Sequence, residues 1–233
     1  MNTPNKFPGL PVTGSATRRG SVSELLATHT VLRNTYLLLS ATLVFSALMA
    51  GLATMLNVGR INPLLSFAGM IGLLFWVQAA RNSAMGLVAV FAFTGFVGFI
   101  TGPIVSMYAR AFPNGSELVM TALGGTGAIF LALSAYAMIS RRDFSRMGSF
   151  LVIGAVVLMV ASIANIFLHI AGLQLAVSAA AMVVFSGFML YDTGRILDGG
   201  ETNYISATVG LYLNIYNVFM SLLSILGFAN RDD

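Results

Sequence analysis

Residues 147–191 read MGSFLVIGAVVLMVASIANIFLHIAGLQLAVSAAAMVVFSGFMLY and carry no charge when His169 is neutral. One helix over this whole range would be roughly 67 Å long, about twice the thickness of the hydrocarbon core of a bilayer. The run therefore predicts two membrane-spanning helices with a turn between them. We place that turn at 169–172, because His-Ile-Ala-Gly is the most polar and flexible part of the run.

Apolar runs of similar length follow one another along the rest of the chain. A spanning helix requires about 20 predominantly apolar residues. By this measure the sequence predicts an all-α membrane protein, a bundle of seven transmembrane helices. The predicted spans are about 35–56, 64–80, 84–107, 118–139, 149–170, 173–196 and 206–228.

The composition supports this interpretation. Of 233 residues, 57% are hydrophobic and 9% are charged, whereas a soluble domain has roughly 25% charged residues. So little charge cannot cover a water-soluble globule, so most of the outer surface must face lipid. The net charge of +4 comes from short basic clusters between apolar runs, a pattern that predicts membrane orientation and no nucleic-acid partner. The chain has no cysteine, which excludes disulfides, cysteine-ligated zinc and cysteine nucleophiles.

Residues 1–34 differ in composition from the rest of the chain. Prolines and small polar residues predict a disordered cytoplasmic tail over 1–20. A short amphipathic helix is predicted over 21–34, because Ser21 and Glu24 have the spacing of a capping box. Apolar side chains then recur on one helical face, which could lie flat on the membrane surface. The remaining residues, 35–233, form the predicted transmembrane domain.

The basic residues predict the orientation, because Lys and Arg are enriched in cytoplasmic loops. With the N-terminus in the cytoplasm, the inner side holds Lys6, Arg18, Arg19, Arg33, Arg81, Arg141, Arg142, Arg146 and Arg195. The outer side then holds Arg60, Arg110 and Arg231. This bias predicts a cytoplasmic N-terminus and, after seven spans, a C-terminus on the outer side.

Polar groups inside the spans are the candidate functional residues, because a charge at mid-bilayer costs at least about 2.5–3.5 kcal/mol. Asp192 is the foremost, and Arg195 lies one helical turn further on. Their alternative role is an ordinary interfacial ion pair. Asn214 and Asn217 are three residues apart, so both could face the bundle interior. Their alternative role is to hold helices together by hydrogen bonds.

Small residues and a proline mark further sites. Gly102 and Pro103 interrupt the third span and predict a helix kink, which could serve gating or only shape packing. Gly98 and Gly102 are four residues apart, as are Ala47 and Gly51, and such pairs let helices approach closely. Packing within the monomer and a dimer interface are the two interpretations.

Known catalytic motifs are missing, so we expect a protein that is not an enzyme and has no cofactor or metal. The chain has no HExxH sequence and no phosphate-binding glycine loop. His169 has no second histidine or carboxylate at metal-ligand spacing. Tyr191-Asp192 resembles the first motif of two-aspartate intramembrane proteases, but the last predicted span contains no acidic residue. A two-aspartate catalyst therefore does not fit.

Five stretches carry a resemblance to a known family. They are 29–36 (HTVLRNTY), 91–96 (FAFTGF), 102–104 (GPI), 199–205 (GGETNYI) and 221–228 (SLLSILGF). From about residue 28 onward the chain resembles the Bax inhibitor-1 family, most closely its bacterial YccA-like branch of FtsH protease modulators. The resemblance implies a bundle of six helices around a central seventh. It also implies a multi-pass location in a bacterial inner membrane.

The resemblance implies two activities. One is binding and restraining a membrane AAA protease of the FtsH type. The alternative is a pH-sensitive calcium or cation leak, which in the family uses an aspartate on the sixth helix and another on the seventh. Asp192 matches the first aspartate, and Asn214 occupies the second position. We therefore expect a latch formed by Asp192 and Asn214, with Arg195 near Asp192 in sequence, Arg81 at a similar depth and Asn217 as a further candidate. We also expect a protease modulator. A structural scaffold without a ligand is a third possibility.

Overall fold

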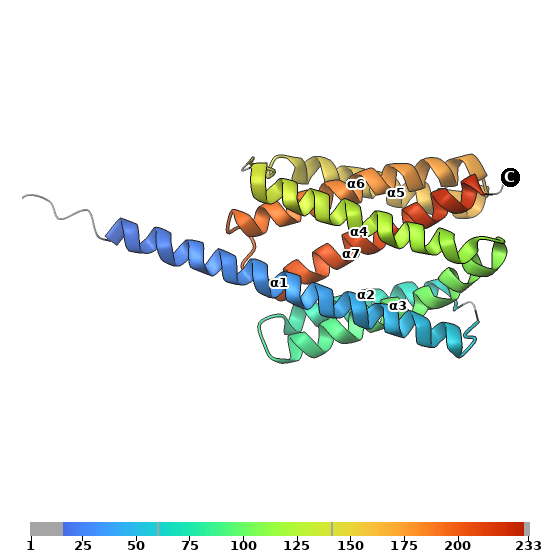
Figure 1. Cartoon of the computed structure of the whole chain (residues 1–233), viewed down its shortest axis with the longest axis horizontal. Helices are drawn as coiled ribbons and strands as arrows, with labels where there is room; N and C mark the ends of the chain where they lie inside the picture. Colours follow the sequence, from blue (N-terminus) through green and yellow to red (C-terminus); the bar gives the residue numbers. More distant parts are fainter. Residues whose placement is uncertain (1–15, 60, 141, 231–233) are drawn as a thin grey trace, which may run out of the picture.

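The computed structural model describes the backbone of residues 16–59, 61–140 and 142–230, and their side chains from residue 28 onward (Figure 1). The described residues form seven α-helices and no strand. They are α1 (Ala16–Met55), α2 (Pro63–Ala80), α3 (Met85–Ala111), α4 (Gly115–Ser140), α5 (Met147–Leu168), α6 (Ala171–Leu197) and α7 (Tyr204–Ala229). All seven are long and apolar enough to cross a membrane, as predicted.

The long uncharged run divides where the sequence predicted. α5 ends at Leu168, and the next residue, His169, has a left-handed φ of 52°. Asn165 closes the turn, because its Oδ1 accepts the Ile170 N–H at 3.1 Å and its Nδ2 donates to Gln174 Oε1 at 3.1 Å. Asn165 is therefore a capping residue that joins α5 to α6.

The N-terminal prediction needs correction. α1 is one continuous helix from Ala16 to Met55, so the short helix predicted over 21–34 is not separate from the first span. The capping signal at Ser21 does not start the helix, since Ser21 already lies inside α1. The helix continues into the first span because the chain from Val22 to Leu48 holds no glycine or proline to interrupt it. In Figure 1, α1 continues well past the other helices. Of the predicted disordered tail, residues 1–15 lie outside the described residues.

α7 is the central helix. It crosses diagonally between one layer of α1, α2 and α3 and another of α4, α5 and α6 (Figure 1). α7 contacts every other helix except α5, which packs on α6 alone. Leu211, Val218 and Leu223 of α7 are fully buried. The predicted arrangement around a central seventh helix is confirmed, except that α6 separates α5 from α7.

Glycines hold α3 close to α1. A Cβ on Gly102 would lie 2.5 Å from the Ala50 carbonyl oxygen and 2.8 Å from Ala53 Cβ. A Cβ on Gly98 would collide with the Ser46 carbonyl oxygen. By contrast, a Cβ on Gly51 would meet open space. The Gly98–Gly102 pair therefore serves packing within the monomer.

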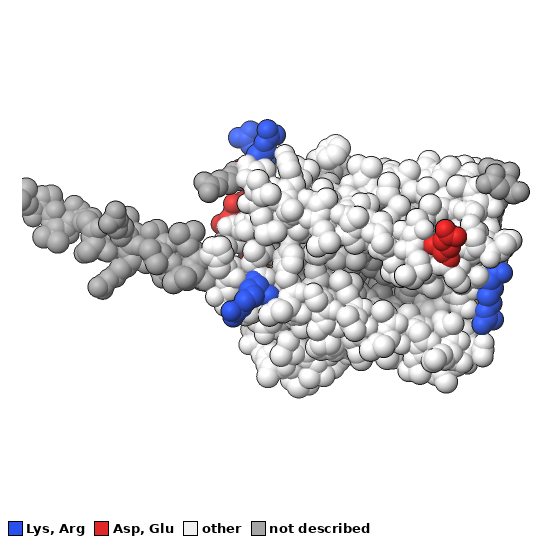
Figure 2. Space-filling view, in the orientation of Figure 1, with Lys and Arg blue, Asp and Glu red and all other residues white. Residues whose placement is uncertain are grey.

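The charged side chains lie at or near the two ends of the bundle (Figure 2). Between them the visible surface is almost free of charge. Large apolar side chains of the helices are exposed, including Leu64, Phe150 and Val183. In water such a surface would be unfavourable, whereas in lipid it carries no penalty. The molecule is a membrane protein.

Candidate functional site

A direct hydrogen bond joins α6 to α7 inside the bundle. Asn214 Nδ2 donates to Asp192 Oδ2 at 2.8 Å, and the Asn214 side chain is buried. Gly210, one turn earlier on α7, leaves room for the carboxylate, because a Cβ there would lie 3.2 Å from Asp192 Oδ2. The structure thus brings together the two residues that the sequence predicted to face each other.

Arg195 has a different partner from the one that the helical spacing indicated. Its Nη2 lies 3.6 Å from Glu201 Oε2 and donates to the Gly200 carbonyl oxygen at 3.4 Å. Its guanidinium carbon lies 5.7 Å from the centre of the Tyr191 ring. The Arg195–Glu201 contact is the one salt bridge within the described residues. Arg195 therefore fixes the loop between α6 and α7, and an ordinary Asp192–Arg195 ion pair is not present.

Asn203 anchors the same loop. Its Oδ1 accepts the N–H groups of Ile205 and Ser206, both at 3.0 Å, and so caps α7. Its Nδ2 donates to the Arg81 carbonyl oxygen at 3.0 Å and to Asn82 Oδ1 at 2.9 Å. Thus α7 is tied to the turn between α2 and α3. Sequence reasoning missed Asn203 as a site residue, although the stretch 199–205 contains it.

The predicted role of Arg81 differs in the structure as well. Its Nη1 donates to Gln78 Oε1 at 3.3 Å, one turn back on α2. Its backbone carbonyl, and not its guanidinium, joins the loop contact with Asn203. Arg81 thus belongs to the same end of the bundle as Asp192 but no hydrogen bond joins the two side chains in the structure as described.

Comparison with known proteins identifies the family. The family model described as "Inhibitor of apoptosis-promoting Bax1" matches residues 28–231. The chain belongs to the Bax inhibitor-1 family. It is 48% identical over 210 residues to the modulator of FtsH protease YccA of Escherichia coli K12, which covers 90% of this chain and 95% of YccA. It is 49% identical over 218 residues to an uncharacterized membrane protein of Vibrio cholerae, covering 93% and 97%.

In this Bax inhibitor-1 family member, Asn217 does not share the environment of Asn214. Its Nδ2 donates to the Leu213 carbonyl oxygen at 2.8 Å, within α7. Its side chain lines a crevice together with Pro103, whereas Gly102 packs on α1. Asn217 therefore lies apart from the Asp192–Asn214 pair, because residues three apart on a helix differ by about 60° in direction.

Tyr212 is a second residue that sequence reasoning missed. Its hydroxyl is hydrogen bonded to Ser46 Oγ at 2.7 Å and donates to the Thr94 carbonyl oxygen at 3.3 Å. Its ring packs edge-on against Phe93, with centroids 6.0 Å apart. Tyr212 thereby ties α7 to α1 and α3. A tyrosine inside an apolar span needs a partner for its hydroxyl, and that need was the available signal.

The arrangement around Asp192 limits its chemistry. An amide donates a hydrogen bond to a carboxylate but cannot exchange a proton with it at neutral pH. No group of three His, Cys, Asp or Glu side chains suited to a metal ion occurs within the described ranges. The site can thus hold two helices together, and it lacks the second carboxylate that proton sharing requires.

Proposed function

We propose that this chain is a non-enzymatic modulator that binds and restrains an FtsH-type membrane AAA protease in a bacterial inner membrane. The observation that carries the proposal is the 48% identity to the E. coli modulator of FtsH protease, which extends over 95% of that protein. A matching sequence from E. coli O6:H1 bears the name inner membrane protein YccA. The matched region covers 90% of this chain and 95% of that protein, so the likeness is not confined to one part of the bundle.

The hydrogen bond between Asn214 and Asp192 supports a holding role for the site. It joins the central helix to α6, while Asn203 joins α7 to the turn after α2. The Arg195–Glu201 salt bridge closes the loop between α6 and α7 at the same end. As observed, the latch comprises Asp192, Asn214, Arg195, Glu201 and Asn203. The side chains of Asn217 and Arg81, which were predicted to belong to it, have other partners. In our proposal the latch keeps the bundle in one arrangement, which the protease meets as a stable partner.

A pH-sensitive cation leak is the second candidate. Its support is a carboxylate, Asp192, that faces α7 within the spans. The amide of Asn214 argues against it, since an amide and a carboxylate do not couple their protonation as two carboxylates do. The protease modulator therefore remains the proposal, and calcium is the ligand that the leak alternative requires.

The orientation belongs to the proposal as well. We infer that the N-terminus and the loop at 141–146 are cytoplasmic, because arginines concentrate on that side. The latch then lies toward the cytoplasm, the side on which an AAA protease pulls its substrates.

Affinity capture tests the proposed partner. The tagged chain is purified in mild detergent from cells that contain an FtsH-type protease, with an unrelated seven-span protein of the same tag as control. We expect the protease with the first protein and not with the second. We also expect added chain to slow the degradation of a membrane substrate in proteoliposomes. Absence of the protease together with unchanged degradation would reject the modulator.

A further inference from the structure

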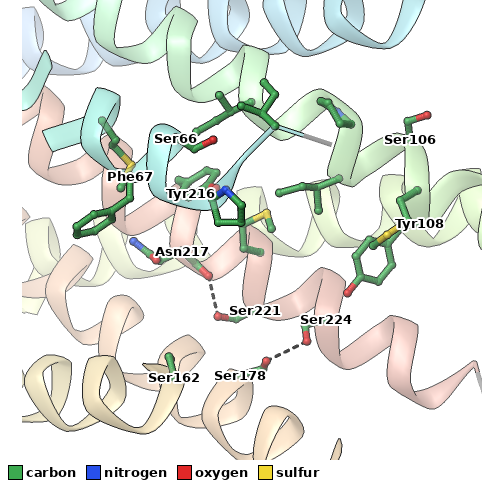
Figure 3. A pocket seen from close by; sticks show the side chains of 18 of the residues that line it. Ser66, Phe67, Ser106, Tyr108, Ser162, Ser178, Tyr216, Asn217, Ser221 and Ser224 are labelled. Carbon is green, nitrogen blue, oxygen red and sulfur yellow. Dashed lines mark hydrogen bonds between the residues drawn. The ribbon is translucent and has the colours of Figure 1, made fainter. Parts of the chain in front are cut away.

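A crevice of about 860 Å³ lies at the end of the bundle that carries Arg110. α2 and α3 form one side, α5 and α6 form the other, and α7 forms the floor (Figure 3). α2 and α6 do not contact each other. Ser162 of α5, Gln174 of α6 and Phe67 of α2 are all exposed although they line the crevice. The crevice is therefore open between α2 and α6, at a level where both helices face the bilayer.

The deep polar side chains of the crevice already have partners. Ser221 Oγ donates to the Asn217 carbonyl oxygen at 2.7 Å, and Ser178 Oγ donates to Ser224 Oγ at 3.0 Å (Figure 3). The amide nitrogen of Asn217 is bonded within α7. Since these donors are satisfied, an apolar chain can lie against them without leaving them unpaired. Apolar side chains supply the rest of the depth, namely Phe67, Met70, Ile100, Ile104, Val177 and Met220.

The rim of the crevice is positively charged. Arg110, in the last turn of α3, is the one charged residue among the described lining residues. Its Nη2 donates to Asn57 Oδ1 at 3.3 Å, and no ion pair of Arg110 occurs in the described ranges. Asn57, Gln174 and Ser106 supply amide and hydroxyl groups to the same crevice. The rim therefore suits an anion that also carries hydroxyl groups, and no described lining carboxylate can receive an ammonium group.

We propose that this crevice binds one anionic glycerophospholipid with an uncharged polyhydroxyl headgroup, the chemistry of phosphatidylglycerol. The phosphate lies at Arg110, and the headgroup hydroxyls bond to Asn57 and Gln174. One acyl chain runs down between Phe67 and Met220. A phosphatidylethanolamine headgroup fits less well, because its ammonium group finds no carboxylate at the rim. This proposal does not depend on the protease.

Lipid preference is measured by native mass spectrometry of the full chain in detergent. Phosphatidylglycerol and phosphatidylethanolamine of the same acyl composition are added in turn, and we expect the first to bind more tightly. Arg110→Gln should reduce that preference by about fivefold, the usual contribution of one arginine at an anionic membrane surface. Arg110→Lys should retain most of it. Arg142→Gln removes an exposed arginine at the opposite end and should change nothing.

Tryptophan quenching locates the lipid. The chain has one tryptophan, Trp76, so Phe67→Trp in a Trp76→Phe background reports on the crevice alone. Brominated phosphatidylglycerol should quench it more than brominated phosphatidylethanolamine does, and Arg110→Gln should reduce the difference. Phe150→Trp, on the exposed face of α5, should be quenched equally by both lipids.

Three results would overturn the proposal. One is equal binding of the two lipids by the native chain, which would remove the headgroup preference. A second is a preference that Arg110→Gln leaves undiminished, which would place the lipid elsewhere. Exclusion of both lipids from position 67 by a helix of another protein would also overturn it.

Discussion

The hydrogen bond between Asn214 and Asp192 predicts what Asn214→Asp does. The two side-chain atoms lie 2.8 Å apart, so the variant brings two carboxylates into contact. At that separation two unit charges repel by about 6 kcal/mol with an effective dielectric constant of about 20. Keeping a proton on an ordinary aspartate at pH 7 costs about 4 kcal/mol. The repulsion is larger, so the variant pair shares one proton at neutral pH.

Calcium leakage from liposomes measures the consequence. The shared proton leaves as the pH rises, and the two charges then push α6 away from α7. We therefore expect Asn214→Asp to leak increasingly between about pH 6 and pH 9. The native protein should leak little across this range, because its amide keeps its hydrogen bond whether or not the buffer supplies protons.

Two variants control for side effects of the added charge. Asn217→Asp adds the same carboxylate one turn away, where the native amide bonds to Leu213 and not to Asp192, so it should not leak in this way. The exchange Asp192→Asn with Asn214→Asp restores one amide and one carboxylate and should abolish the leak. A steep pH-dependent leak through the native protein, or equal leakage by the exchanged pair, would refute the reasoning.

Three further predictions concern topology, turnover and packing. A reporter fused after Asp233 should be active only outside the membrane, and one inserted at 141–146 only in the cytoplasm; activity of both on one side would contradict the orientation. Deleting residues 2–20 should lengthen the lifetime of the protein in cells with an FtsH-type protease, and an unchanged lifetime in pulse-chase would mean that the protease engages elsewhere. Gly102→Val should lower the free energy of unfolding by about 1–3 kcal/mol, because Ala50 and Ala53 occupy the required space. The measurement is a lower thermal unfolding temperature in detergent. Gly51→Ala, in open space, should be near neutral.

The helices were predictable because membrane spans depend on length and polarity, which the sequence displays directly. The turn at His169 followed from the same argument, since a longer helix would not fit the bilayer. The resemblance paired Asp192 with Asn214 correctly. What the sequence could not predict depends on loop paths and on small rotations. Gly199, with a φ of 72°, belongs to the loop that brings Glu201 to Arg195, and helical spacing says nothing about such a loop.

The environment of Asn217 illustrates the second limit. Residues three apart on a helix differ by about 60° in direction, which is small enough to predict a shared face. In the packed bundle the same 60° directs Asn214 to α6 and Asn217 to the crevice. Which neighbour lies at each angle is decided by how the helices cross, and the local sequence does not encode that crossing.

The unbroken course of α1 has a mechanical consequence. Because its backbone is helical from Ala16 to Met55, a pulling force applied at its N-terminal end acts along a single stiff rod. Such a force shears the whole α1–α3 contact at once, whereas a hinge would let the contact peel apart turn by turn. Gly98 and Gly102 pack α3 against the backbone of α1 at Ser46 and Ala50, so sliding must break that close contact. We therefore expect α1 to resist the force that would extract the protein from the membrane.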